Sequence, residues 1–465
     1  MVFSSVVFLF YFLPIFLTLY FLIPGIPTKN LFFLFASLLF YTWGEPWFVL
    51  VLLCIIAFNY IAALAIDWAA DEWKTAAATV GVAGNLAALG TFKYLDFFIQ
   101  NINAAFGKAV IAVGPFGFLP LGISFVSFHA ISYLVDVRRG KATANPDPLQ
   151  IALYLSMFPQ LVAGPIVRYN TIYRQLGARR TTFGRAAVGV RIFIIGLAQK
   201  VLIADETARI ADAVFDRTMH SGFLESWLGV GAYTLQIYFD FMGYSNMAIG
   251  LAIMVGLRFP RNFRLPYRSQ SVTEFWRRWH MSLSAWFRDY VYIPLGGNRS
   301  SNGRTYVNLG TVFLLCGMWH GAQWTFAIWG IHHGFFLIIE RAGLSQRLKH
   351  ASPAIGWLYA MLAVMTGWVW FRAKDATHAL DLFAGMAGLN GFSPVSVSTH
   401  LQLYPTTMGA MLIGATLSVA AELPRPVARL VPRWITDTVF VWLVFALSGL
   451  SVAAGSYSPF LYFRF

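Results

Sequence analysis

The sequence predicts an all-α polytopic membrane protein, with about ten to twelve transmembrane helices plus re-entrant and interfacial helices around a central cavity. Of the 465 residues, 58% are hydrophobic and 12% are charged, whereas about 25% are charged in an ordinary soluble domain. Long runs without a charged residue recur along the chain, and a helix of about 20 apolar residues crosses a bilayer. This composition excludes disordered proteins, disulfide scaffolds and soluble globular domains.

The charge-free runs locate the expected spans. They cover residues 2–28, 46–66, 75–92, 109–135, 148–167, 305–339, 350–371, 382–421 and 438–463. The run 226–257 holds a single charge, Asp240, and two shorter runs at 30–44 and 192–199 predict spans or half-spans. We expect one membrane-embedded domain over residues 1–465, with its motif-bearing core at about 158–334.

One of these runs is interrupted by helix-breaking residues. Residues 148–167 contain Pro159, Gly164 and Pro165, and basic residues flank both ends. If basic loops face the cytoplasm, both ends lie on one side of the membrane. Irregular backbone at membrane depth survives only inside protein or beside a wet cavity. The run therefore predicts a re-entrant hairpin at an internal cavity, with a proline-kinked helix as the alternative.

The basic charge of the chain is concentrated in an arginine-rich tract. Residues 258–304 contain nine Arg against two acidic residues, within a net charge of +14. Tryptophans and tyrosines are interspersed with the arginines, a combination typical of a membrane interface. We expect amphipathic helices at the cytoplasmic face around residues 272–290, followed by a turn at 294–298.

Histidines in the apolar run 305–339 are the first candidates for chemistry. His320 lies near the middle of the run, where a neutral imidazole is suited to act as a general base or as a hydrogen-bonded structural group. His332 and His333 follow near the far end of the expected helix, at the interface. Cys316 shares a helix face with His320, so its thiol is either a nucleophile or a small packing group.

Two further polar residues stand out in apolar or aromatic surroundings. His280 closes an aromatic and basic stretch, and is a second candidate for acid–base chemistry or for an interfacial role. Asp240 is expected to form a structural ion pair with an Arg of the following tract, or to accept a hydrogen bond from Tyr244. No metal-ligand spacing, nucleophile elbow, phosphate-binding loop or dinucleotide fingerprint occurs.

Six ordered blocks resemble the membrane-bound O-acyltransferase (MBOAT) family, and within it the bacterial branch of alginate O-acetylation. They are 158–168 (FPQLVAGPIVR), 236–245 (QIYFDFMGYS), 262–267 (NFRLPY), 273–280 (TEFWRRWH), 288–299 (RDYVYIPLGGNR) and 318–321 (MWHG). The chain departs from the usual family pattern at Met242, Asn246 and Cys316. Related proteins usually have Gly at the position of Cys316, so a nucleophilic thiol at this position would not be general to the family.

The resemblance implies a site built around two catalytic histidines. His320 matches the near-invariant family histidine, and His280 fills the second polar position of the site. Donor binding or support of the site is expected from Asp240, Tyr244, Trp319, Trp324, Arg277, Arg278 and Asn298. An indole N–H of Trp319 or Trp324, or a protonated His280, would stabilise the oxyanion.

The resemblance also implies a function. We expect an enzyme that moves acetyl groups from acetyl-CoA, or another acyl thioester, across the bacterial inner membrane. The acceptor would be an exported or periplasmic polysaccharide such as alginate or cellulose, reached through a periplasmic O-acetyltransferase and a polysaccharide synthesis and export complex. Membrane lipids are the other partners; no bound cofactor, metal or nucleic acid is expected.

Two alternatives to this function stay open from the sequence. One is D-alanyl transfer from a carrier protein to teichoic acid, by a protein of the same fold. The other is a non-enzymatic subunit for polysaccharide export or transport. Transporters often show repeat symmetry between their halves, and no internal repeat is visible here.

Overall fold

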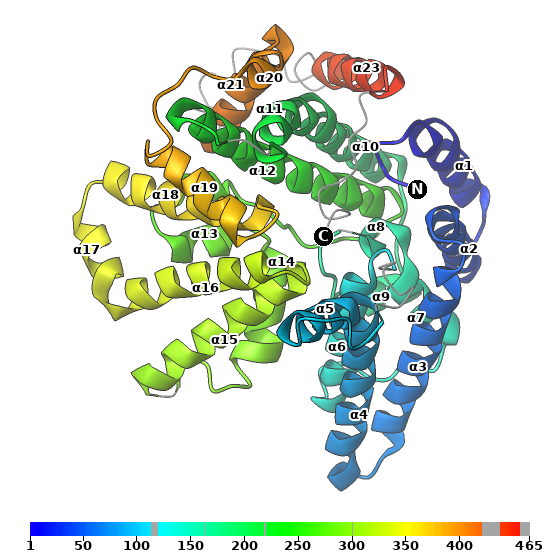
Figure 1. Ribbon diagram of the computed structural model, residues 1–465. Helices are drawn as coiled ribbons and strands as arrows, with labels where there is room; N and C mark the ends of the chain where they lie inside the picture. Colours follow the sequence, from blue (N-terminus) through cyan, green and yellow to red (C-terminus); the bar gives the residue numbers. More distant parts are fainter. Residues whose placement is uncertain (113–119, 163, 218–219, 300, 421–437, 456–465) are drawn as a thin grey trace. The chain divides into compact units, whose positions relative to one another are not determined.

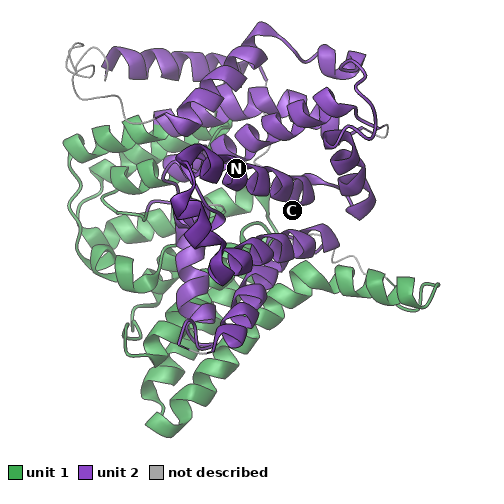
Figure 2. Cartoon of the chain, turned by 90° about the vertical axis from the view of Figure 1, so that its left-hand side faces the viewer, with its two compact units in different colours: residues 1–193, 247–260 green, residues 194–246, 261–465 purple. Residues whose placement is uncertain are grey.

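A computed structural model describes residues 1–112, 120–162, 164–217, 220–299, 301–420 and 438–455. These residues form helices joined by turns and loops, and no strand occurs among them. The chain divides into two compact units, Met1–Phe193 with Met247–Pro260, and Ile194–Asn246 with Arg261–Phe465 (Figure 2). The all-α prediction is confirmed, and the single domain over 1–465 stays a prediction.

Several helices are long and apolar enough to cross a membrane. Within the described ranges there are four such stretches: Phe48–Trp68, Asp71–Ala105, Phe183–Phe215 and Pro353–Arg372. Shorter apolar helices cover Phe8–Leu22, Pro405–Val419 and Phe440–Ala453. The protein is therefore polytopic, as its composition predicts, and the total of about ten to twelve crossings stays a prediction.

The first unit is built from the N-terminal helices. They are η1 (Phe8–Phe12), α1 (Leu13–Leu22), α2 (Ile26–Gly44), α3 (Phe48–Trp68), α4 (Asp71–Leu89), η2 (Gly90–Tyr94), α5 (Leu95–Ala105), α6 (Ile123–Arg138), α7 (Pro148–Ser156), α8 (Phe158–Leu161) and α9 (Tyr169–Gly177) (Figure 1). The unit also contains most of α10 (Phe183–Ala198) and the end of α12 (Phe223–Met254). A buried pair of amides, Asn59 and Asn85, joins α3 to α4 through hydrogen bonds of 2.8 and 2.9 Å.

The interrupted run 148–167 folds as two short helices. Met157 is extended between α7 and α8, and each helix begins with a proline in its first turn. The Phe158 ring is fully buried and packs against Phe16 and Phe33 at centroid distances of 5.2 and 5.5 Å. The predicted break is confirmed, and the aromatic cluster around Phe158 provides the burial that irregular backbone at membrane depth requires.

The second unit contains the arginine-rich tract and the C-terminal helices. Before the tract lie the end of α10, η3 (Gln199–Ala204), α11 (Asp205–Phe215) and most of α12. The tract itself and the next helices are η4 (Pro266–Arg268), α13 (Val272–Arg278), α14 (Met281–Phe287), η5 (Arg288–Tyr292), α15 (Asn302–His320) and α16 (Trp324–Ile339). They are followed by η6 (Glu340–Leu344), α17 (Ser345–His350), α18 (Pro353–Arg372), α19 (Ala376–Met386), α20 (Val397–His400), α21 (Pro405–Val419) and α23 (Phe440–Ala453).

The tryptophans of the arginine-rich tract are buried inside the protein. Trp276, Trp279 and Trp286 are 7%, 2% and 5% exposed, so α13 and α14 pack into the second unit as well as carrying basic residues. The predicted turn at 294–298 is present, with positive φ at Gly296 and Gly297. Glycine is the residue that adopts this conformation without strain.

The run 305–339 corrects one expectation. It was expected to form a single helix, but it forms α15 and α16, which lie side by side as a hairpin (Figure 1). Gly321 is extended and ends α15. A Cβ at Gly317 would overlap the carbonyl oxygen of Phe326, so only small residues allow this close approach. His320 consequently ends a helix rather than lying in the middle of one.

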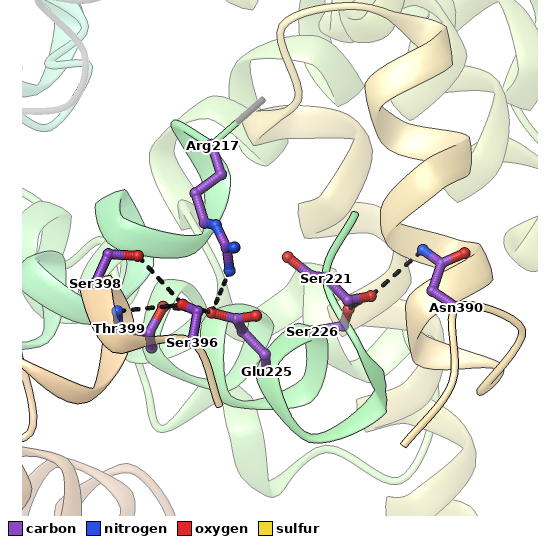
Figure 3. A network of polar contacts seen from close by, with 8 residues as sticks. All are labelled: Arg217, Ser221, Glu225, Ser226, Asn390, Ser396, Ser398 and Thr399. Carbon is purple, nitrogen blue, oxygen red and sulfur yellow. Dashed lines mark hydrogen bonds and ion pairs between the residues drawn. The ribbon is translucent and has the colours of Figure 1, made fainter. Parts of the chain in front are cut away.

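A buried carboxylate holds the segment after α19 against the start of α12. Glu225 accepts hydrogen bonds from the hydroxyls of Ser396 and Thr399, both at 2.5 Å, and pairs with Arg217 at 2.6 Å (Figure 3). Asn390 donates to the carbonyl oxygen of Ser221 at 3.3 Å. The apolar run 382–421 is thereby divided into α19, α20 and α21 around a polar anchor.

Candidate active site

Two chain segments bring His280 and His320 to the same indole. His280 lies between α13 and α14, and its ring centroid is 6.3 Å from that of Trp319. His320 follows Trp319 at the end of α15, with ring centroids 4.8 Å apart. The side chains are 0% exposed for His280 and 5% for His320. The structure therefore assembles His280, Trp319 and His320, which we call the histidine cluster.

His280 is surrounded by apolar rings. The Phe241 ring of α12 lies edge-on at 4.6 Å, and neither imidazole nitrogen has a hydrogen-bond partner in the described chain. Burial without a compensating charge disfavours the imidazolium and lowers the pKa of His280 to about 3. This environment favours a neutral ring at physiological pH, rather than the protonated His280 considered above as an oxyanion stabiliser.

His333 is buried inside the protein. Its side chain is 0% exposed, and its Nδ1 accepts a hydrogen bond from the Trp276 indole at 3.4 Å. Trp329 contacts His333 and His320, with centroid distances of 5.0 Å to each ring. The α15–α16 hairpin brings Trp329 and His333 beside α15, and the expected level of His333 at the membrane interface stays a prediction.

One cavity in the second unit is strongly basic. Its volume is about 1070 Å³, and its lining includes Arg261, Arg264, Arg268 and Arg278. Glu274 is the acidic residue in the lining, and it pairs with Arg278 at 2.7 Å. Among the described residues the other three arginines form no ion pair, and we call this cavity the basic cavity.

Another cavity of the second unit is mainly apolar. It has a volume of about 560 Å³, and Trp276, Arg277 and Cys316 contribute to its lining. Met281 lines both cavities and directly follows His280. Cys316 stands one turn before His320 on α15, so the apolar cavity reaches the helix that carries the histidine.

Asp240 has a partner that differs from the one expected. It pairs with Lys200 at 2.7 Å, and Lys200 also pairs with Asp205 at 2.7 Å. Asp240 was expected to pair with an Arg of the following tract or to accept a hydrogen bond from Tyr244, and Lys200, which lies in the π-helical turn η3, is a partner that neither alternative named. The sequence reasoning missed Lys200, although a lone lysine at the end of the run 192–199 was a signal for it. Tyr244 lies one turn further along α12 and is 2% exposed.

Trp324 and Asn298 lie outside the histidine cluster. Trp324 is 62% exposed at the first residue of α16, which separates it from the buried Trp319. Asn298 is exposed and accepts hydrogen bonds from the hydroxyl of Tyr292 and the guanidinium of Arg341. Tyr292 lines the apolar cavity, so Asn298 supports a wall of that cavity.

Known proteins resemble this chain, two of those named below over its whole length. The sequence model of MBOAT, the membrane-bound O-acyltransferase family, matches residues 38–370. A probable alginate O-acetylase AlgI of Azotobacter vinelandii is 41% identical, and the similarity covers 100% of both chains. A peptidoglycan O-acetyltransferase of Helicobacter pylori is 34% identical over 100% of this chain and 98% of its own. A teichoic acid D-alanyltransferase of Bacillus subtilis is 29% identical over 47% of this chain and 58% of its own.

Proposed function

The chain belongs to the membrane-bound O-acyltransferase family and is an O-acyltransferase, and from this we propose that it transfers acetyl groups from acetyl-CoA. The acceptor is an exported polysaccharide such as alginate, served through a periplasmic O-acetyltransferase, and the protein lies in the bacterial inner membrane. Full-length similarity to a probable alginate O-acetylase and to a peptidoglycan O-acetyltransferase supports acetyl as the group transferred.

The basic cavity is the observation that supports acetyl-CoA as the acetyl donor. Coenzyme A bears several phosphate charges, and unpaired guanidinium groups attract and hold phosphate oxygens. Arg261, Arg264 and Arg268 provide such groups in one cavity. Since Met281 lines this cavity and adjoins His280, a donor held there has its thioester end near the histidine cluster.

The proposed chemistry uses the imidazole of His320 as a general base. His320 takes the proton of the acceptor hydroxyl as its oxygen attacks the thioester carbonyl carbon. The C–O ester bond forms, the C–S bond breaks, and the proton passes to the departing thiolate of coenzyme A. The Trp319 indole N–H and the N–H of a neutral His280 would donate hydrogen bonds to the oxyanion.

The two alternative functions have less support. The teichoic acid D-alanyltransferase is similar over about half of this chain, whereas the O-acetylation relatives are similar over all of it. Membership of an acyltransferase family favours an enzyme over a transport subunit.

Replacement of His320 by Ala tests the proposal. The purified protein in nanodiscs receives labelled acetyl-CoA, the periplasmic O-acetyltransferase and a soluble polysaccharide acceptor, and acetyl transfer and thioester hydrolysis are both measured. We expect His320→Ala to lose at least about a hundredfold in rate, the usual scale for a general base. Binding of coenzyme A should be retained, because the basic cavity is unchanged.

The exposed His350 provides the matched control, and His350→Ala should transfer acetyl at the wild-type rate. Wild-type acetylation by His320→Ala would overturn the assignment of the base. Transfer from a D-alanyl carrier protein, with none from acetyl-CoA, would overturn the choice of donor.

A further inference from the structure

The first unit contains a groove that the acyl-transfer site does not use. It has a volume of about 420 Å³ and lies between the first turns of α10 and the segment that follows α12. Its lining is Gly184, Arg185, Val188, Ile253, Gly256, Leu257, Arg258 and Phe259.

The groove combines cationic and apolar chemistry. Arg185 and Arg258 are both exposed, and neither has an ion pair within the described ranges. Val188, Leu257 and Phe259 form its apolar wall, and none of the lining residues is acidic. A ligand that matches this lining carries a negative charge at one end and hydrocarbon beside it.

The groove lies at the end of a membrane span. Phe183 begins the spanning stretch Phe183–Phe215, is 83% exposed, and stacks on Phe21 at 5.7 Å. Aromatic and cationic residues at the end of a span mark the level of the lipid headgroups, and basic ends face the cytoplasm. Anionic lipids are concentrated in that leaflet, and basic pockets between helices bind their headgroups.

The two sides of the groove are joined by hydrogen bonds that do not involve the guanidinium groups of Arg185 and Arg258. Arg179 and the hydroxyl of Tyr20 donate to the carbonyl oxygen of Val255 at 3.1 and 2.9 Å. The backbone N–H of Arg258 donates to the side chain of Gln175 at 2.9 Å. Since these contacts connect the chain before α10 to the end of α12, the groove is formed before any ligand arrives.

We propose that this groove binds an anionic phospholipid of the cytoplasmic leaflet. The headgroup phosphate lies between Arg185 and Arg258, and the first acyl carbons cover Val188, Leu257 and Phe259. The proposal is independent of acyl transfer, because the basic cavity and the histidine cluster belong to the second unit.

Lipid binding to purified protein tests the proposal. The wild type and an R185Q/R258Q double variant are titrated with phosphatidylglycerol or phosphatidylcholine in mixed micelles, and bound lipid is measured by native mass spectrometry. We expect the wild type to prefer phosphatidylglycerol, and the double variant to bind it on the order of tenfold more weakly. The matched control is R347Q/K349Q, which removes two exposed charges from α17 and should bind like the wild type.

A second variant separates loss of binding from loss of folding. Val188→Trp keeps both arginines, starts from a half-exposed position, and fills the groove with an indole. It should also bind phosphatidylglycerol more weakly. Unchanged phosphatidylglycerol binding in Val188→Trp, or equal affinity of the wild type for both lipids, would overturn the proposal. Binding of inorganic phosphate to the wild type, with no additional binding of phosphatidylglycerol, would also overturn it.

Discussion

His280 adopts a backbone conformation that a non-glycine residue rarely accepts. Its φ and ψ are 40° and 55°, in the left-handed region, which costs roughly 1–2 kcal/mol for an ordinary side chain. The turn is held by hydrogen bonds of 2.9 Å from Arg264 to Arg278 and from Met281 to Asn262. These contacts turn the imidazole inward to Phe241, so the strain places a polar ring at the centre of an aromatic cluster.

The low pKa of His280 makes the stability of the protein depend on pH. The unfolded chain binds a proton with a pKa near 6.5, whereas the folded chain does so only near 3. Between these values the unfolded state holds more protons, so stability rises with pH and is lost as pH falls below about 6.5. From pH 7.5 to 5.5, wild type should lose about 1.4 kcal/mol more stability than His280→Asn.

Thermal and denaturant unfolding in detergent measure this difference. Asn is the matched replacement because it tolerates the left-handed region and does not titrate. His350→Asn, at an exposed position, should lose as much stability as the wild type. Equal losses for the wild type and His280→Asn would contradict the prediction.

Among the helices, the α15–α16 hairpin is the element that builds the site. It ends α15 at His320 and places Trp329 of α16 against that ring. Close packing of the two helices relies on glycines: a Cβ at Gly330 would overlap the carbonyl oxygen of Phe313. The helix α12, whose Phe241 ring contacts His280, is held separately by the ion pair between Asp240 and the buried Lys200.

Gly330→Ala should therefore disturb both stability and activity. The added methyl group forces α15 and α16 apart, and overpacking of this kind costs about 1–3 kcal/mol. We expect a lower unfolding temperature and a reduced rate of acetyl transfer, because Trp329 moves with α16. Gly310→Ala on α15 is the control, since a Cβ there meets no atom within 4 Å. A Gly330→Ala protein as stable and active as Gly310→Ala would refute this account of the hairpin.

At the scale of the whole molecule, the basic residues behind the net charge of +14 line more than one kind of site. Arginines of the tract 258–304 line the basic cavity of the second unit. Arg185 and Arg258 line the groove of the first unit instead. Topology alone accounts for an excess of basic residues at the cytoplasmic ends of spans. Topology does not account for Arg261, Arg264 and Arg268, which line one cavity and form no ion pair among the described residues.

Salt should weaken donor binding if the basic cavity holds coenzyme A. Raising sodium chloride from about 0.05 to 0.5 M shortens the Debye length and should raise the KM for acetyl-CoA several-fold, with kcat nearly unchanged. A short acetyl thioester without phosphates is the control substrate, and its KM should not respond to salt. A KM for acetyl-CoA that is insensitive to salt would count against the cavity as the phosphate site.

The sequence alone was sufficient for the fold class, because hydrophobicity and the length of charge-free runs are local properties that the bilayer requires. It also singled out His320, since a polar residue in an apolar run is costly enough to be conspicuous, whereas His280 was noticed at the end of an aromatic and basic stretch and through the family resemblance. Only the tertiary structure decided that His333 is buried, that Asp240 pairs with Lys200 and that Trp324 is exposed. The burial of His333 and the exposure of Trp324 depend on the fold-back at Gly321, and the pair of Asp240 with Lys200 depends on the π-helical turn η3. Which side chains then meet is determined by packing between segments distant in the chain, and no local pattern encodes it.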